Sequence, residues 1–193
     1  MKALKTLFSV ALFGMATSMS ANNLVESASV APSASAGENY QKVSISYNAS
    51  SLKYDGGSES WGGFDMGYIY GISVSQAHPM FVEVGGSIQF RKDEDLKMTS
   101  LNIPVNFVYK FDVAEDFAIK PLVGIDLRLN MFGSEGLFDK NVMDCGRFQA
   151  GWHLGAQFEY KKFELGVTYG QDFNEITDEL RVTNTLISVG YNF

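Results

Sequence analysis

The stretch Leu186-Ile187-Ser188-Val189-Gly190-Tyr191-Asn192-Phe193 decides the fold. Its apolar side chains fall at every second residue, with polar or small residues between them. Side chains of a β-strand point alternately to its two faces, so this spacing predicts a strand with one apolar face. Terminal residues are usually poorly ordered unless the fold ties them down. We therefore expect this strand to be the closing element of the fold, with lipid or an apolar core against its apolar face.

The same alternation occurs in seven segments upstream of this strand. Polar, charged or glycine residues occupy the opposite face of each segment. The eight segments are 42–49, 64–74, 80–90, 101–111, 117–129, 148–160, 163–170 and 183–193. Alternation over about ten residues per segment is the strand pattern of membrane barrels. The sequence therefore predicts an all-β protein, an eight-stranded antiparallel up-and-down transmembrane β-barrel.

The connections between these segments alternate between short and long. The short ones are Ser75–Pro79, Asp112–Asp116 and Lys161–Lys162. The long, polar ones are Ser50–Gly62, Lys92–Lys97, Asn130–Gly146 and Gln171–Val182. Short turns at one end and long loops at the other are typical of bacterial outer-membrane barrels. An even number of strands places both ends of the barrel domain on the short-turn side.

Apolar side chains at every second residue are also compatible with a soluble barrel or sandwich, in which the apolar face is the core. Two observations favour a lipid-facing apolar side. Charged residues such as Glu83 and Asp126 share the polar face in mid-strand with many glycines, which suits a narrow lumen better than a solvent-facing strand. Aromatic residues also gather at the strand ends, as at two lipid–water interfaces.

The N-terminus has the features of an export signal. Lys2 and Lys5 precede the short apolar run Leu7–Ala16, which is too short to span a bilayer. We expect residues 1–20 to be a signal peptide, with cleavage after Ser18 or after Ser20. Residues 21–38 have the composition of a flexible periplasmic linker, and residues 39–193 form the barrel domain.

Charge and cysteine content exclude several functions. The chain has 15 basic and 22 acidic residues and a formal charge of −7, and it lacks a basic run, so we expect no nucleic-acid partner. The single cysteine, Cys145, cannot form an internal disulfide. No ligand spacing for zinc is present, and we expect no metal and no cofactor.

The stretch Leu101–Phe111 (LNIPVNFVYKF), together with the closing strand, resembles outer-membrane β-barrel domain proteins of Bacteroidetes, in the OmpX-like and OmpA-barrel-like group. The resemblance implies a monomer in the bacterial outer membrane, with membrane lipid and lipopolysaccharide as partners. It also implies that Tyr191 and Phe193 form the assembly signal read by the barrel-assembly machinery. Ser188 departs from the family pattern, which often has glycine there.

The charged residues of the polar face are predicted to form a lumen network. Those expected toward the short-turn end are Lys42, Glu83, Lys110, Lys120, Glu159 and Glu164. Those expected toward the loop end are Asp65, Arg91, Asp126, Arg128, Arg147 and Asp172. An eight-stranded barrel is just wide enough for side chains to fill it, and buried charges must be compensated. We expect a paired plug and a structural or surface-interaction role, with a narrow porin-like channel for small ions or solutes as the alternative.

Little in the sequence indicates catalysis. The two histidines are His78, in a short turn, and His153, on the lumen face without a serine two residues away, so we expect no enzyme. The acidic loops either gather divalent cations next to lipopolysaccharide or are solvated loop faces. The apolar residues of loop Asn130–Gly146 either form a binding surface for an extracellular ligand or pack over the barrel mouth. Pro104 and Pro121 interrupt two strands, and we expect a bulge near residues 98–104.

Overall fold

Strands make up most of the chain in this computed structural model, which describes residues 36–54, 57–93, 96–134, 138–139, 146–174 and 181–193. These residues belong to one compact unit, which spans Pro32–Phe193. The strands are β1 (Tyr40–Tyr54), β2 (Gly57–Ser73), β3 (Met80–Asp93), β4 (Leu96–Tyr109), β5 (Phe111–Ala114), β6 (Phe117–Gly133), β7 (Phe148–Tyr160), β8 (Phe163–Asp172) and β9 (Arg181–Asn192). The predicted signal peptide and most of the predicted linker lie outside the described residues.

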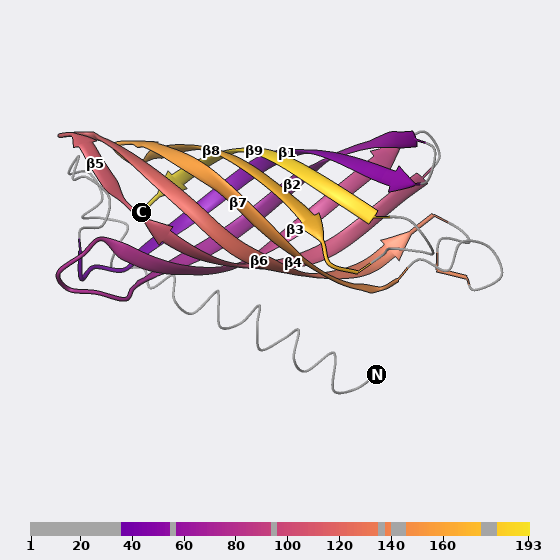
Figure 1. The fold of residues 1–193 in the computed structure, drawn as a ribbon, viewed down its shortest axis with the longest axis horizontal. Helices are drawn as coiled ribbons and strands as arrows, with labels where there is room; N and C mark the ends of the chain where they lie inside the picture. Colours follow the sequence, from indigo (N-terminus) through magenta and orange to yellow (C-terminus); the bar gives the residue numbers. More distant parts are fainter. Residues whose placement is uncertain (1–35, 55–56, 94–95, 135–137, 140–145, 175–180) are drawn as a thin grey trace. The chain divides into compact units, whose positions relative to one another are not determined.

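The sheet closes on itself through two pairings. Strand β9 pairs with β1, and β4 pairs with β6, so the antiparallel order β4-β3-β2-β1-β9-β8-β7-β6 forms a ring. Figure 1 shows these long strands tilted around a common barrel axis. Strand β5 has four residues and adds a short ladder beside the start of β6. The predicted closed eight-stranded antiparallel barrel is therefore confirmed, with β5 as an extension of one turn.

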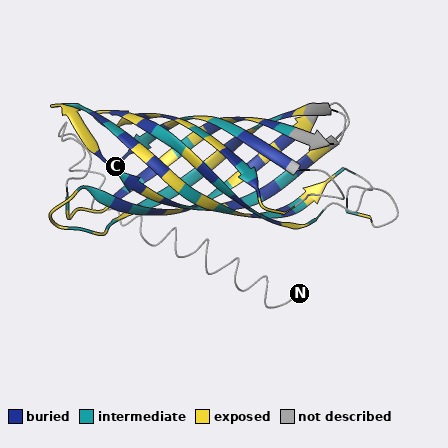
Figure 2. Cartoon of the chain, in the orientation of Figure 1, coloured by how far each residue is buried: buried dark blue, intermediate teal, exposed yellow. Residues whose placement is uncertain are grey.

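Burial separates the two faces of every long strand. Lumen-facing charged side chains are almost fully buried, as for Lys42 at 1% and Glu83 at 0% exposure. Outward apolar side chains are exposed, as for Ile45 at 57% and Val189 at 59%. Figure 2 shows the resulting alternation of buried and exposed positions along the strands. A soluble barrel would bury its apolar face, so this arrangement excludes the soluble alternative and requires an apolar surrounding medium.

The strands extend further at the loop end than the apolar alternation predicts. Strands β1 and β2 remain paired as far as Tyr54 and Gly57, and β3 and β4 as far as Asp93 and Leu96. Most of the predicted loops Ser50–Gly62 and Lys92–Lys97 are therefore strand. Backbone pairing continues into the polar region because it does not depend on an apolar outer face. Among the described residues, no helix is long and apolar enough to cross a membrane.

The predicted bulge lies in the pairing of β4 with β6. The register shifts between Thr99 and Ser100, which pair with Phe132 and Asn130, so Met131 is the extra residue. Strand β4 itself keeps its phase through this region, because Met98 faces the lumen and is 2% exposed. The apolar residue at position 98 therefore belongs to the interior and not to the lipid-facing side.

Both prolines lie where one neighbouring ladder is interrupted. The pairing of β3 with β4 breaks between Val84–Val105 and Ser87–Asn102, which is where Pro104 lies in β4. The pairing of β4 with β6 ends at Leu122, and that of β5 with β6 begins at Ile119, so Pro121 faces the break between β4 and β5. Proline has no N–H to donate, so it is tolerated where no ladder bond is needed.

Apolar side chains occupy the two ends of the lumen. Tyr40, Phe81, Val108 and Leu122 form a buried cluster near the short turns, here called the turn-end cap. The rings of Tyr40 and Phe81 pack edge to face with centroids 5.2 Å apart. Toward the loop end, Trp61, Met98 and Val182 are also buried. The polar network therefore lies between apolar residues at both ends of the barrel.

Candidate functional site

The lumen contains nearly all the charged side chains that the sequence assigned to it. They come from β1, β2, β3, β6, β7 and β8, and Lys110 lies in the break between β4 and β5. The buried ones are Lys42, Asp65, Glu83, Arg91, Lys110, Lys120, Arg128, Glu159, Glu164 and Asp172. Asp126 also faces the lumen, with 19% of its side chain exposed. Alternation places these residues inside because each stands out of phase with the apolar face of its strand.

The short-turn half of the lumen holds a chain of alternating charges. Lys42 Nζ lies 2.9 Å from Glu83 Oε1 and 2.6 Å from Glu164 Oε1. Lys120 contacts Glu164 and lies 3.2 Å from Glu159 Oε2. Lys110 Nζ ends the chain 3.1 Å from Glu159 Oε1. We call this set (Glu83, Lys42, Glu164, Lys120, Glu159 and Lys110) the charge chain.

The charge chain is neutral, and hydrogen bonds satisfy the carboxylate of Glu83 at one end. Tyr40 of the turn-end cap donates its hydroxyl to Glu83 Oε1 at 2.5 Å, and Asn106 Nδ2 donates to Glu83 Oε2 at 2.9 Å. Lys120 Nζ also lies 4.8 Å from the centroid of the Tyr40 ring. Three cations and three carboxylates thus compensate one another, which is the condition for retaining charge in a buried site.

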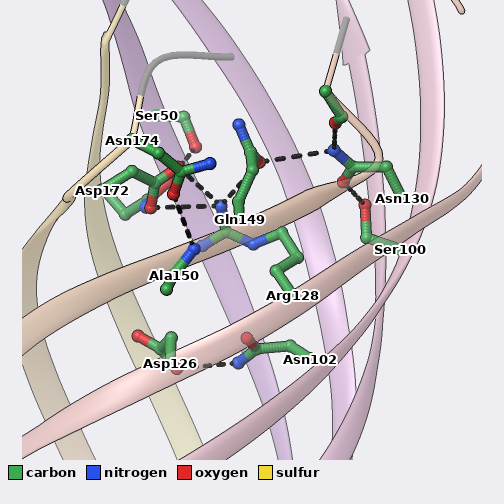
Figure 3. A network of polar contacts seen from close by, with 12 residues as sticks. Ser50, Ser100, Asn102, Asp126, Arg128, Asn130, Gln149, Ala150, Asp172 and Asn174 are labelled. Carbon is green, nitrogen blue, oxygen red and sulfur yellow. Dashed lines mark hydrogen bonds and ion pairs between the residues drawn. The ribbon is translucent and has the colours of Figure 1, made fainter.

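The loop-side half of the lumen is organised around two arginines. Arg128 Nη1 lies 2.9 Å from Asp172 Oδ2 and donates to Gln149, as Figure 3 shows. Arg91 Nη2 donates to Asn184 Oδ1 at 3.1 Å. Gln89 accepts from Arg91 through Oε1 and donates to Asp65 Oδ2 at 3.0 Å. This layer mixes ion pairs with amides, in contrast to the purely ionic chain below it.

His153 of β7 links the two halves. Its Nδ1 lies 2.6 Å from Asp126 Oδ2, and its Nε2 lies 2.6 Å from Asn106 Oδ1. Asn106 directs its amide nitrogen to Glu83, so its oxygen faces the ring. Both ring nitrogens therefore face oxygen atoms, so the ring bridges Asp126 and Asn106. With both nitrogens engaged, His153 has none left to activate a nucleophile.

Arg147 was predicted to join the lumen network, and this prediction is wrong. Its side chain is exposed, one residue before β7 begins at Phe148. The guanidinium lies 4.5 Å from the ring centroid of Phe138, and Nη1 donates to the carbonyl of Met131 at 3.5 Å. The prediction assumes that the alternation of β7 includes Arg147, but the strand begins one residue later. At position 147 the side chain therefore does not point into the lumen.

The predicted assembly residues lie at the seam between the last strand and the first. Tyr191 pairs in register with Val43 of β1 and Phe163 of β8. Its ring centroid lies 5.4 Å from that of Phe163 and 5.5 Å from that of Phe193. The amide of Phe193 donates to the carbonyl of Gln41 at 2.9 Å. Backbone pairing therefore reaches the last residue, and its ring lies on the outer surface.

Among the described residues, no group of three His, Cys, Asp or Glu side chains is arranged to hold a metal ion. The acidic hairpin and loop residues at 94–95, 135, 144 and 175–179 lie outside the described residues, as does Cys145. The predicted ligand-binding loop is described only at its start, at 138–139 and at its end. The described geometry of the lumen is thus that of a compensated polar network.

A protein-family model for the outer membrane protein beta-barrel domain matches residues 9–193. The chain belongs to this family. No curated protein sequence matches it significantly.

Three solved structures illustrate the likeness in fold. Ail, the attachment invasion locus protein of Yersinia pestis, is 17% identical with a TM-score of 0.52, over 81% of this chain and 99% of Ail. The outer membrane enzyme PagL is 14% identical with a TM-score of 0.58, over 78% of this chain and 98% of PagL. Neisserial surface protein A is 13% identical with a TM-score of 0.51, over 79% of this chain and 97% of that protein. This family member therefore shares its eight-stranded barrel with proteins that include an enzyme.

Proposed function

We propose that the chain is an integral protein of the bacterial outer membrane whose lumen is filled by side chains, with a structural or surface-interaction role. The observation that carries this proposal is the charge chain across the lumen, packed against the turn-end cap. The six buried ionic groups are paired with one another. A passing ion would therefore have to break these ion pairs to cross the lumen. The apolar cap beneath them adds a barrier to hydrated ions.

The outer surface supports the membrane location. Exposed aromatic side chains stand near the strand ends, such as Phe132 and Phe148 at the loop end and Phe163 and Phe193 at the short-turn end. Exposed aliphatic side chains fill the region between them. Two aromatic belts around an apolar band match the two interfaces of a lipid bilayer. Lipid and lipopolysaccharide are the partners that this surface fits, and the protein would act as a monomer.

Two experiments test this proposal. Cell fractionation should place the mature protein in the outer membrane, and the folded protein should migrate faster on a gel than the boiled protein. Planar-bilayer recording of the purified barrel should show no unitary conductance. A soluble periplasmic species would overturn the membrane location. Reproducible conductance steps would instead favour the alternative, a narrow porin-like channel for small ions or solutes.

The loops are the remaining candidate for a specific role. With the lumen closed by the charge chain and the turn-end cap, as proposed above, contact with an extracellular ligand would involve the long loop between β6 and β7. Replacing that loop by a short turn and assaying attachment of whole cells to a surface tests this role. Loss of attachment with normal barrel yield is the expected outcome, whereas unchanged attachment would leave only the structural role.

A further inference from the structure

A cavity of about 100 Å³ lies in the middle of the lumen, between the charge chain and the loop-side arginines. Hydroxyl groups from four strands line it. They belong to Ser44 and Ser46 of β1, Ser87 of β3, Thr168 of β8 and Ser188 of β9. All five residues stand on the lumen face of their strands, in phase with the buried charges. This hydroxyl belt is therefore an internal feature of the barrel.

The cavity exists because small residues meet at this level. Gly67 pairs with Ser44 on one side and with Ser87 on the other. Gly155 pairs with Thr168, and Gly166 pairs with Ser188. A Cβ at Gly67 would lie 2.9 Å from the Cβ of Ser87, so larger residues would have to displace their neighbours. Alternating glycine and hydroxyl residues thus leave space where other levels of the lumen are filled.

The hydroxyls of the belt have no partner within the described part of the protein. No hydrogen bond from Ser44, Ser46, Ser87, Thr168 or Ser188 side chains occurs among these residues. Ser46 is nevertheless only 8% exposed. Three further lining residues keep one buried polar atom unpaired: Asp65 Oδ1, Asn102 Oδ1 and Arg128 Nε. Buried polar groups of this kind nearly always have a hydrogen-bond partner.

The chemistry of the lining selects the ligand. Most of its charges have ion-pair partners, as Lys42 has Glu164, Arg128 has Asp172 and His153 has Asp126. Asp65 has none among the described residues, but its Oδ2 accepts a hydrogen bond from Gln89. The nearby positive charges of Arg91 and Arg128 also act on the Asp65 carboxylate. A charged ligand would therefore face no uncompensated opposite charge. The remaining groups are hydroxyls that both donate and accept, two acceptor oxygens and one donor. A small neutral molecule that both donates and accepts hydrogen bonds fits this set.

We propose that the cavity is a binding site for a cluster of several water molecules held by the hydroxyl belt. A buried water needs about 10–15 Å³ of such volume and two to four polar partners, and the cavity provides both for several molecules. The turn-end cap and charge chain separate the cluster from one end of the barrel. Trp61, Met98 and Val182 stand toward the other end, so the waters exchange slowly with bulk solvent.

Magnetisation transfer from water to protein tests this proposal on the full barrel domain refolded in lipid nanodiscs. Transfer to the backbone amides of Ser46, Ser87 and Ser188 is expected, with a residence time longer than that of surface water. Absence of transfer at all three positions overturns the site. Transfer with the rapid exchange of bulk water also overturns it, because it would indicate an open lumen. That result would fail the non-conducting proposal as well, whereas absent transfer leaves that proposal intact.

Two variants separate bound water from other sources of the signal. Ser87→Leu adds carbon atoms that occupy the cavity, so the transfer to Ser46 and Ser188 should be lost. Thr185→Val changes a threonine on the outward face of β9 to its isosteric apolar counterpart and should leave the transfer unchanged. Faster gel migration of unboiled samples verifies that both variants have folded. Transfer that persists in folded Ser87→Leu overturns the assignment to this cavity.

Discussion

Lys42 shows how single residues hold the lumen together. Its ammonium group contacts Glu83 and Glu164, which come from β3 and β8, and its side chain is 2% exposed. One cation thus compensates two carboxylates from opposite sides of the barrel. Removing one member of a buried charge set is costly because the remaining charge cannot reach water.

We expect Lys42→Met to lower the free energy of unfolding by about 3–5 kcal/mol, because two buried carboxylates lose a partner. Urea unfolding of the barrel in lipid vesicles measures this change. Lys161→Met is the matched control, since Lys161 and Asp116 are partly exposed and 3.7 Å apart. Exposed pairs contribute about 0–1 kcal/mol, so equal losses in the two variants would contradict the role given to Lys42.

His153→Leu should lower the free energy of unfolding by about 1.5–3 kcal/mol, because Asp126 and Asn106 lose a hydrogen-bond donor in the lumen. Thermal unfolding of the refolded barrel in detergent checks this. His78→Leu provides the control, since His78 lies exposed in the turn before β3. A similar loss from both substitutions would show that the bridge adds nothing to stability.

At the residue level, the sequence allowed prediction of which charges face inward but not of their partners. Glu83 and Lys120 are placed in the lumen by alternation alone. The pairing of Lys42 with Glu164 joins residues 122 positions apart and depends on how the barrel staggers its strands. Arg147 shows the limit of the pattern, because a strand boundary one residue away reverses its environment.

Strand β9 is the element on which closure depends. It pairs with β1 from Lys53–Arg181 to Lys42–Asn192 and with β8 along its other edge. In hydrocarbon an unpaired strand edge costs several kcal/mol per group, so the barrel requires both pairings. The aromatic residues at the end of β9 therefore lie at the seam between the last strand and the first.

We expect Phe193→Ala to slow assembly severalfold, because the exposed terminal ring is the feature that assembly factors would bind. The rate at which the heat-modifiable form appears after synthesis gives the measurement. Phe132→Ala is a suitable control, because this ring is 69% exposed near the loop end and lies far from the seam in β6. Normal kinetics for Phe193→Ala would remove the assembly role from the last residue.

At the level of elements, period-two alternation located the eight long strands but not their full length. The outer parts of β1 and β2 lack an apolar face, so hydropathy gives no signal while backbone pairing continues. Strand β5 escaped prediction for a related reason. The predicted strand 101–111 and the predicted turn Asp112–Asp116 include its four residues. The interruption between β4 and β5 at Lys110 does not change the pattern of apolar and polar residues.

For the whole molecule, the arrangement is inverted relative to a soluble protein, with charge inside and apolar residues outside. Alternation and the aromatic ends were sufficient to predict this. The turn-end cap was not predicted, because Phe81 and Val108 stand on faces that are otherwise polar. Only the packing of several strands around one axis shows that these isolated apolar residues meet.

Phe81→Ala should leave the barrel non-conducting, because the charge chain still crosses the lumen above the shortened side chain. Planar-bilayer recordings at matched protein density compare the variant with the unsubstituted protein. Unchanged gel migration shows that the variant has inserted and folded. Conductance steps in Phe81→Ala alone would mean that the apolar cap, and not the ionic network, is the main barrier.

The interruption in the pairing of β3 with β4 determines where the barrel wall first opens locally. A closed sheet has no edge strand that can separate first, so local opening must begin where backbone hydrogen bonds are already missing. Gly85 and Gly86 face that gap with Ile103 and Pro104, and neither glycine has a side chain to cover it. Solvent deuterium should therefore enter the backbone here before it reaches any other mid-strand position of β3.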